Sequence, residues 1–319
     1  MTTTRHWLVT GGAGFIGSHL LAALVERGER VRVLDDFSTG LRERLEPFNA
    51  RFELIEGTIV DPATCAKACR GVTHVLHQAA IPSVQRSVED PMATHAACAT
   101  GTLNVLQAAQ EAGVQRVVYA GSSSPYGNTP ELPKRESMPS NPRSPYAVAK
   151  LAGEQYVKAF AAVYGLEGVT LRYFNIFGPG QDPSSDYAAV IPKFITSALE
   201  GRPPTIFGDG EQTRDFTYIA NVVEANLQVA TAPAERVSGR MFNMGCGDRI
   251  SVNRLWTEIR DLTGTSVDAR YDEARPGDVR DSLAAMDAIR EAVGFEPFVD
   301  LREGLRRTVE AFRREGVGV

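Results

Sequence analysis

The chain has 319 residues, of which 43% are hydrophobic and 23% are charged, and its formal net charge is −5. This composition is typical of a globular protein, and the length favours one large domain with a smaller lobe. The negative charge, with no run of Lys or Arg, argues against nucleic acid as a partner. No apolar stretch reaches the roughly 20 residues that span a bilayer, so we expect no membrane segment.

The cysteines and histidines indicate a reducing compartment and no metal site. Cys65, Cys69, Cys98 and Cys246 form neither a Cys-x-x-Cys pair nor a zinc pattern, and the five histidines are scattered. Residues 1–6 run directly into the first predicted strand, which leaves no room for a signal peptide. We therefore predict a cytoplasmic location and no metal.

Short apolar runs alternate with helical stretches through the first half of the chain. The predicted strands are residues 7–10, 30–34, 52–55, 74–77, 117–120 and 169–173. The predicted helices are residues 15–27, 62–70, 92–112 and 146–164, and each is followed by a glycine that suits a helix C-terminus. This alternation predicts an α/β fold with a Rossmann-type, doubly wound parallel sheet that helices cover on both faces.

The pattern changes near residue 177, where glycine, proline and serine become frequent. Helices are predicted over residues 187–200, 251–263, 284–292 and 300–315, separated by short strands, which indicates a smaller mixed α/β lobe. Residues 241–244 are predicted to return to the main sheet. The sequence thus predicts a cofactor-binding domain over residues 1–176 plus about 214–245, and a substrate-binding lobe over 177–213 and 246–319.

A glycine-rich run follows the first predicted strand and opens the first predicted helix. Gly11 suits a tight turn, Gly14 lets the backbone approach a pyrophosphate, and Gly17 permits close helix–strand packing. The helix N-terminus then offers N–H groups to the phosphates. Asp35 ends the second strand, where a carboxylate accepts from both ribose hydroxyls and repels a 2′-phosphate. The arginines of that strand are expected to point elsewhere, so NAD is predicted rather than NADP.

Tyr146 and Lys150 lie four residues apart, downstream of this fingerprint. Ser144 and Pro145 are typical of a helix N-cap and first helical position, so Tyr146 and Lys150 should lie on one face of the helix. A phenol beside an ammonium can act as a base at a C–OH group next to a nicotinamide. The spacing alone is common in helices, but after a dinucleotide fingerprint it predicts catalysis.

Further motifs extend this pattern. With the glycine run, Asp35, the Ser-Ser-Ser-Pro-Tyr-Gly segment at 122–127 and the Tyr146/Lys150 pair in order, the chain resembles the extended short-chain dehydrogenase/reductases. Among them it is most similar to nucleotide-sugar 4-epimerases of the UDP-galactose and UDP-N-acetylglucosamine type. The resemblance covers nearly the whole chain and includes residues 172–179, 187–192, 207–218 and 275–282.

The resemblance implies a set of site residues. The catalytic set is Ser122, Tyr146 and Lys150. NAD would be held by Gly11, Gly14, Phe15, Ile16, Gly17, Asp35, Asp36, Thr58, Ile59, Gln78, Ala79, Ala80, Tyr146, Lys150 and Tyr173. The UDP-hexose would contact Ser83, Ser122, Ser123, Ser124, Tyr146, Asn175, Ala189, Val190, Phe207, Arg214, Arg275, Asp278 and Ser282. Arg214 and Arg275 would bind the diphosphate, and Val190 and Phe207 would contact the uracil. The alternative for the two arginines is that they form ion pairs at the surface.

The chain departs from these relatives near the cofactor. Thr58 stands where many carry an Asp that meets the adenine amino group, although a hydroxyl can pair with the amine and Asp61 is close by. Ala97 and Cys98 replace a frequent Asn, and Gly121 replaces a common serine. None of these changes removes a group that the chemistry requires.

The resemblance also implies a mechanism. Tyr146 would take the proton from the sugar O4 as hydride leaves C4 for NAD, while Ser122 steadies the charge on O4. The Lys150 ammonium and the nicotinamide ring are expected to lower the pKa of Tyr146 from about 10. The keto sugar would then turn over and take the hydride back on its other face, which regenerates NAD in place.

Other activities on this fold stay open as alternatives. Dehydratases and decarboxylases carry an acid directly after the catalytic hydroxyl, where this chain has Ser123 and Ser124. Glucuronate 4-epimerases tend to carry a basic residue where the chain has residues 181–183, Gln-Asp-Pro, and Thr in place of Asn175. A non-catalytic NAD-binding protein or a net reductase is a further alternative, against which the intact catalytic set argues.

Two expectations concern assembly and specificity. The helices near 92–112 and 146–164 carry many Ala, Val and Leu residues, and family members pair these helices, so we expect a homodimer; burial within the monomer is the alternative. Ser282 lies seven residues beyond Arg275, where the resemblance places the wall beside the sugar C2 group. A serine there leaves room for an N-acetyl group, unless it caps the following helix instead.

Overall fold

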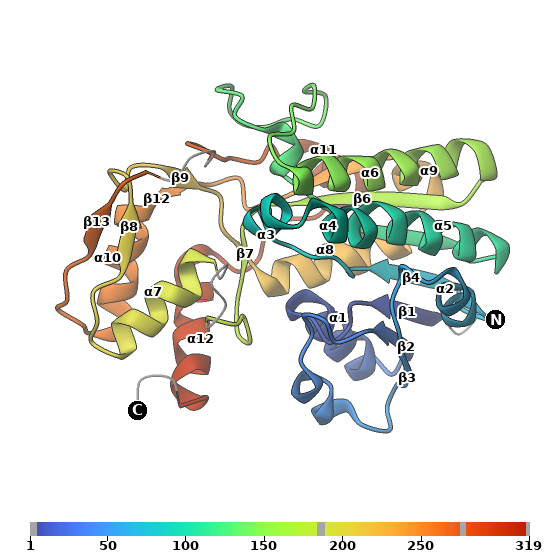
Figure 1. The fold of residues 1–319 in the computed structure, drawn as a ribbon, viewed down its shortest axis with the longest axis horizontal. Helices are drawn as coiled ribbons and strands as arrows, with labels where there is room; N and C mark the ends of the chain where they lie inside the picture. The colour runs from blue at the N-terminus through green and yellow to red at the C-terminus, as the bar shows by residue number, and fades with distance from the viewer. Residues whose placement is uncertain (1–4, 184–188, 275–278, 317–319) are drawn as a thin grey trace.

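The computed structural model describes residues 5–183, 189–274 and 279–316. Its centre is a seven-stranded parallel sheet in the order β11-β6-β5-β4-β1-β2-β3 (Figure 1). The order reverses between β1 and β4, which confirms the predicted doubly wound fold. Ligands of such sheets bind outside the carboxyl ends of the strands at this point. The strands are β1 (His6–Thr10), β2 (Arg30–Asp35), β3 (Glu53–Glu56), β4 (His74–His77), β5 (Arg116–Ser122), β6 (Glu167–Tyr173) and β11 (Met241–Met244).

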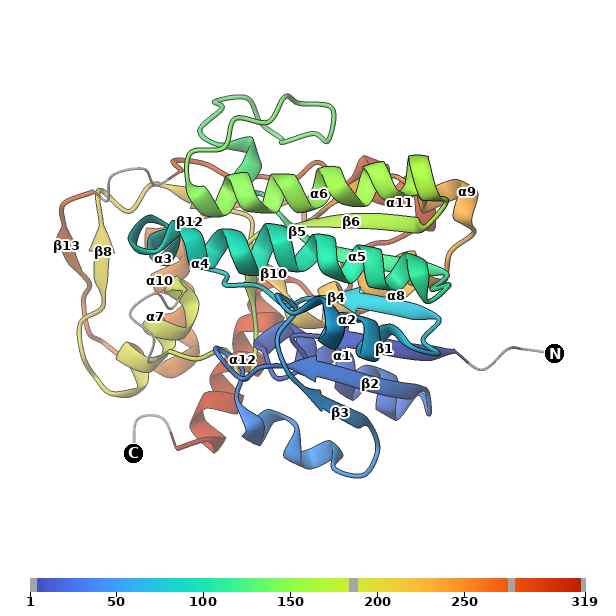
Figure 2. The same ribbon diagram turned by 45° about the vertical axis from the view of Figure 1, so that its right-hand side comes forward.

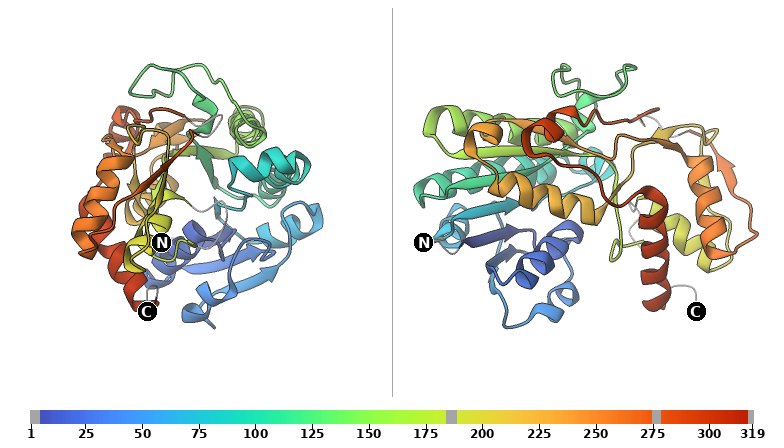
Figure 3. Two further views of the ribbon diagram at one scale, coloured as in Figure 1. Left: turned by 60° about the vertical axis from the view of Figure 1, so that its left-hand side comes forward. Right: turned by 180° about the vertical axis from the view of Figure 1, so that it is seen from behind.

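Helices cover both faces of this sheet (Figures 1 and 3). Alternate residues of β1 reach the two layers, because Trp7 and Val9 belong to one apolar core and Leu8 to the other. Strands buried on both faces read as continuous apolar runs, which is why the sequence predicts them well. The covering helices are α1 (Phe15–Glu26) and α8 (Ile219–Thr231) on one face, and α2 (Pro62–Cys69), α5 (Gly101–Glu111) and α6 (Pro145–Tyr164) on the other.

Two helical regions differ from the prediction. The helix expected over 92–112 is divided, since α4 (Pro91–His95) passes through a π-helical turn, η3 (Ala96–Thr100), before α5 begins. Such turns are rare and occur mostly at functional sites, and this one packs against α6. The sequence does not predict α8, because that helix follows β10 (Thr217–Tyr218) directly and has no side-chain cap.

The smaller lobe lies beyond one end of the sheet (Figure 2). The chain enters it through β7 (Ile176–Phe177), which pairs with β10, and the returning strand β11 pairs with β6. The predicted boundaries near 176, 213 and 245 stay a prediction. The lobe contains α7 (Val190–Leu199), β8 (Thr205–Phe207), β9 (Thr213–Arg214), β12 (Ile250–Ser251), α10 (Val252–Thr263), β13 (Arg270–Asp272) and α12 (Leu301–Arg314).

None of the described helices is both long and apolar enough to span a membrane. All four cysteines are free thiols. The remaining elements are η1 (Arg42–Arg44), η2 (Glu46–Phe48), α3 (Val84–Glu89), η4 (Ser124–Tyr126), α9 (Ala234–Val237) and α11 (Asp287–Val293).

Candidate active site

The glycine-rich loop lies at the carboxyl end of β1. Gly11 has a φ of +68°, and a Cβ at this position would come within 2.7 Å of the Ala79 backbone nitrogen, so a side chain is excluded. Gly14 is the N-cap of α1, and no side chain caps that helix. The N–H groups of the first turn, which begins at Phe15 and Ile16, are therefore available to an anion. These features fit the pyrophosphate of a dinucleotide.

Asp35 connects the end of β2 to this loop. It is buried, its Oδ2 accepts the Ala13 N–H at 2.8 Å, and its Oδ1 accepts the Phe37 N–H at 2.8 Å. Burial raises the pKa of Asp35, and these two hydrogen bonds oppose that shift. Each oxygen keeps a further lone pair, so the carboxylate can also accept ribose hydroxyls. As predicted, Arg32 points elsewhere: it donates to Glu53 at 2.8 Å and to two backbone carbonyls.

Three further predicted cofactor residues lie at the carboxyl ends of β4 and β6. The Tyr173 hydroxyl lies 3.2 Å from Gln78 Oε1 and 3.1 Å from the side-chain oxygen of Asn226 on α8. The Ala79 N–H donates to Thr10 Oγ1 at 3.2 Å. Asn226, which sequence reasoning missed, is fully buried and holds the Tyr173 hydroxyl in place. Because the sequence does not predict α8, no signal marked this residue.

Several other predicted polar residues serve local turns. Asp36 accepts the N–H two residues ahead, Asp61 caps α2, and Ser83 caps α3. Asp61 thus caps its own helix, and its expected place near the adenine stays a prediction. The Thr58 hydroxyl accepts a main-chain N–H at 3.3 Å, and Ile59 is buried beside it.

Tyr146 and Lys150 lie on the first two turns of α6, above the end of β5. The Ser144 hydroxyl caps this helix by accepting the Ala147 N–H at 3.2 Å, as the sequence predicts. Lys150 is buried, and its Nζ donates to the Ala120 carbonyl at 2.9 Å. Ala80 and Tyr146 both pack against a small buried cluster of Cys98, Ala99 and Ala149.

Ser122 ends β5 close to Tyr146, near enough for its hydroxyl to affect the pKa of the phenol. Its hydroxyl accepts the Ser124 N–H at 3.1 Å and lies 3.0 Å from the Ser124 hydroxyl. The Ser123 N–H donates to the Tyr173 carbonyl at 3.1 Å. The structure thus brings the predicted serine run and the tyrosine together.

The pKa of Tyr146 differs from the expectation. Burial raises the pKa of this phenol, and the nearby Ser122 hydroxyl opposes the shift. Burial also lowers the pKa of Lys150. Lys150 does not lower the Tyr146 pKa, because the ammonium is directed to the Ala120 carbonyl and lies 6.0 Å from the centroid of the Tyr146 ring. The expected lowering by the nicotinamide ring stays a prediction.

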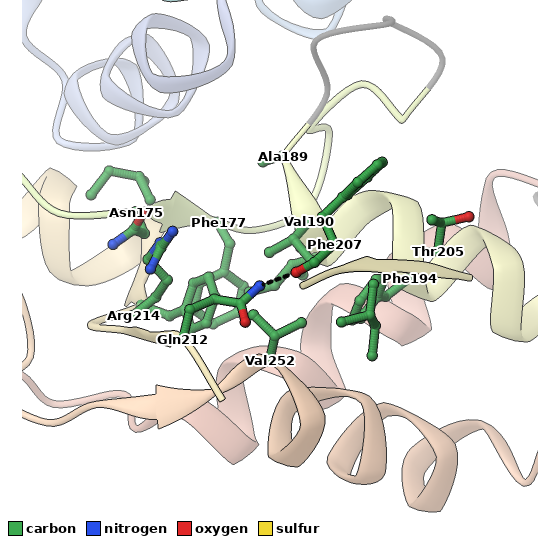
Figure 4. Close-up of a pocket in the computed structure, with 14 residues that line it drawn as sticks. Asn175, Phe177, Ala189, Val190, Phe194, Thr205, Phe207, Gln212, Arg214 and Val252 are labelled. Carbon is green, nitrogen blue, oxygen red and sulfur yellow. Dashed lines mark hydrogen bonds between the residues drawn. The ribbon is translucent and has the colours of Figure 1, made fainter. Parts of the chain in front are cut away.

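A cavity of about 280 Å³ lies between the main sheet and the smaller lobe. Figure 4 shows Asn175 and Arg214 together at one end, with Phe194 and Thr205 at the other. Gln212, which sequence reasoning missed, donates to the Phe207 carbonyl at 2.7 Å, and its buried Oε1 has no hydrogen-bond partner. The predicted substrate residues that line the cavity are Asn175, Ala189, Val190, Phe207 and Arg214.

Ser282 lies next to this cavity. Its hydroxyl accepts from the Asn175 side-chain amide at 3.2 Å and from the Asp215 N–H at 3.4 Å. It does not cap α11, whose N-cap is Met286, so that alternative is wrong. The other two predicted substrate residues on this segment, Arg275 and Asp278, lie outside the described residues.

Asp215 holds three segments of the site together, and sequence reasoning missed it. Its carboxylate accepts the N–H groups of Cys246, Gly247 and Ala284 at 2.8, 3.1 and 3.0 Å. Burial raises the pKa of Asp215 to about 6 against these bonds. One acid before an aromatic residue carries no sequence signal for such contacts, which come from distant parts of the chain.

Within the described ranges, no group of three or more His, Cys, Asp or Glu side chains could hold a metal ion.

The sequence matches the NAD dependent epimerase/dehydratase family over residues 7–245. The chain belongs to this family. That membership confirms the predicted resemblance to extended short-chain dehydrogenase/reductases and NAD as the cofactor.

Individual family members are similar over almost their whole length. A UDP-glucose 4-epimerase from Mycolicibacterium smegmatis is 39% identical over 97% of this chain and 98% of its own. A UDP-N-acetyl-alpha-D-glucosaminuronate decarboxylase from Bacillus cytotoxicus is 34% identical over 97% of this chain and 98% of its own. The solved structure of a UDP-N-acetylglucosamine 4-epimerase from Methanobrevibacter ruminantium, in complex with UDP-N-acetylmuramic acid, is also similar. It is 38% identical, has a TM-score of 0.92, and the match covers 98% of this chain and 100% of that one.

Proposed function

We propose that this family member catalyses the reversible C4 epimerisation of UDP-hexoses, converting UDP-glucose and UDP-galactose and also their 2-N-acetylated forms. The observation that carries this proposal is that Ser122, at the carboxyl end of β5, lies close to Tyr146, with Lys150 one turn further along the same helix. A hydroxyl pair at the carboxyl end of β5, one strand from the switch point of the sheet, suits oxidation and reduction of a secondary alcohol. The epimerase relatives support the same activity.

Each catalytic residue has a separate task in this proposal. Tyr146 takes the proton from the sugar O4 and later returns it, and Ser122 donates to O4 as charge develops there. Ser124 holds the Ser122 hydroxyl in place through the contacts at 3.0 and 3.1 Å. Bound NAD supplies a reversible hydride acceptor. Lys150, bonded to the Ala120 carbonyl, holds the tyrosine face of α6 against β5.

The cavity would hold the nucleotide part of the substrate. Arg214 lies at the same end as Asn175, and its guanidinium fork suits diphosphate oxygens. Apolar side chains line the rest of the cavity, and Val190 and Phe207 among them are available to a flat base.

Decarboxylation is the second candidate, since one relative with 34% identity carries that activity. By the resemblance, a decarboxylase needs an acid directly after the catalytic hydroxyl. Here Ser123 and Ser124 occupy those positions, and Ser124 is engaged with Ser122. Epimerisation is therefore the better supported activity.

A homodimer completes the proposal. The outer face of α6 exposes Val148 (53%), Tyr156 (38%) and Val163 (72%), and Met92 on α4 is 75% exposed. Apolar groups gathered on adjacent helices are typical of a protein–protein interface. A second copy of this chain, presenting the same helices, would cover them.

The activity can be tested with purified protein and UDP-galactose, without added reductant. Appearance of UDP-glucose, and of UDP-N-acetylgalactosamine from UDP-N-acetylglucosamine, is the expected result. Accumulation of a keto sugar, or release of carbon dioxide from a UDP-uronic acid, would replace the proposal with one of its alternatives.

A further inference from the structure

Residues 36–44, which we term the cofactor strap, leave Asp35 and cross the glycine-rich loop. The Leu41 N–H donates to the Ala13 carbonyl at 3.0 Å, while the N–H of the same Ala13 donates to Asp35 at 2.8 Å. A Cβ on Gly40 would lie 2.8 Å from the Ala13 Cβ and 2.9 Å from Asp35 Oδ1. The strap therefore packs directly on the two parts of the predicted cofactor site.

Arg44 fastens the end of this strap. Its Nη1 donates to the Ala13 carbonyl at 3.2 Å, and its Nη2 donates to the Gly180 carbonyl at 2.6 Å. Gly180 belongs to the segment that leads from β7 into the smaller lobe. The half-buried guanidinium thus bonds the strap, the glycine-rich loop and this connecting segment in one place.

A second side chain strengthens the same junction. A ring nitrogen of His19, on α1, lies 2.9 Å from the Pro179 carbonyl. The connecting segment is therefore held to the cofactor domain at two consecutive residues. Because this segment is anchored, the Gly180 carbonyl offers Arg44 a fixed acceptor. The bond is also stronger than one between neutral groups, since the guanidinium donor is charged.

We propose that Arg44 is a latch that retains NAD. It keeps the strap closed over the Asp35 end of the cofactor site by tying it to Gly180, so that NAD leaves only after these bonds break. The planar guanidinium fork suits this role, since two carbonyls from different segments must be reached at once and an ammonium on a flexible stem matches that geometry less well.

Arg51 provides a matched control. It lies seven residues after Arg44, and its Nη2 donates to the Val25 carbonyl at 3.1 Å, near the end of α1. Replacing Arg51 removes a guanidinium–carbonyl bond of the same kind from the same region. It leaves the strap, Ala13 and Gly180 untouched.

The test measures NAD dissociation from the intact protein. Protein loaded with labelled NAD is mixed with excess unlabelled NAD, and the bound label is followed with time for wild type, Arg44→Ala, Arg44→Lys and Arg51→Ala. We expect label to leave Arg44→Ala about tenfold faster or more, because charge-assisted bonds are lost. Arg44→Lys should be intermediate, and Arg51→Ala should match wild type within about twofold.

Circular dichroism of each variant checks folding before the label is followed. If Arg44→Ala does not fold, Arg44→Lys decides: faster release than wild type supports the latch, and an unchanged rate overturns it. Equal release from wild type and Arg44→Ala, or equal acceleration by Arg51→Ala, also overturns the proposal.

Discussion

The Ser282 hydroxyl accepts a hydrogen bond from the Asn175 side-chain amide at 3.2 Å, although 107 residues separate the two positions. Asn175 has a φ of +36°, and its side-chain amide also donates to the Asp215 carbonyl at 2.9 Å. The contact joins the end of β6 to the segment that precedes α11. The small Ser282 side chain therefore helps to fix the position of Asn175, which lines this end of the cavity.

Ser282→Tyr should abolish turnover of the N-acetylated UDP-hexoses while the non-acetylated pair is still converted. Ser282 is buried, and overfilling a packed site costs about 1–3 kcal/mol. Ser282→Ala, the control, keeps the space and should keep the ratio of kcat/KM between the two substrate classes. If Ser282→Tyr also leaves that ratio as it is in wild type, position 282 is not the specificity wall.

Tyr146→Phe should reduce kcat by about 10²–10⁴, which is typical for loss of a general acid–base group. The ring stays in its apolar cluster with Ala80, so NAD content should be unchanged. Both quantities are measurable on one preparation, by initial rates and by the nucleotide released on denaturation. A near-normal rate would assign the proton transfer to another group.

Asp215 should make stability depend on pH. Its folded-state pKa of about 6 exceeds its usual value of about 4, so the neutral form favours folding. Its contribution to the free energy of unfolding is therefore present below pH about 4 and is lost as the pH rises through about 6. The shift corresponds to about 3 kcal/mol.

Asp215→Asn removes this titration while other groups are unchanged. Urea titration gives the free energy of unfolding of both proteins at pH values of about 4.5 and about 7.5, on either side of the Asp215 pKa of about 6. The difference between wild type and variant should be smaller at the higher pH. A difference that is flat or grows with pH would contradict the raised pKa.

The proposed dimer should depend on the outer face of α6. Val163→Asp places a charge where an apolar side chain is 72% exposed, and light scattering at micromolar concentration should then give the mass of one chain instead of two. Phe298→Asp is the control, because Phe298 is 62% exposed but lies outside α4 and α6. A wild-type protein with the mass of one chain would end the dimer proposal.

Local signals account for the parts that sequence reasoning predicts well. The buried strand His6–Thr10 carries an apolar run, residues 7–9, and the Ser144–Pro145 start of α6 follows from capping chemistry. Long-range contacts account for the rest. The direction of Lys150 toward Ala120 depends on how α6 packs over β5, and no spacing in the sequence encodes it.

The fate of deuterium at C4 tests the central claim most directly. If Ser122 and Tyr146 serve a reversible transfer within one closed site, UDP-[4-²H]galactose incubated with the protein, without added reductant, should give UDP-glucose that keeps the label at C4. Mass spectrometry of the product and NMR of the sugar ring locate the label. Loss of the label to solvent or to free NADH, or its appearance at another carbon, would contradict epimerisation by internal hydride return.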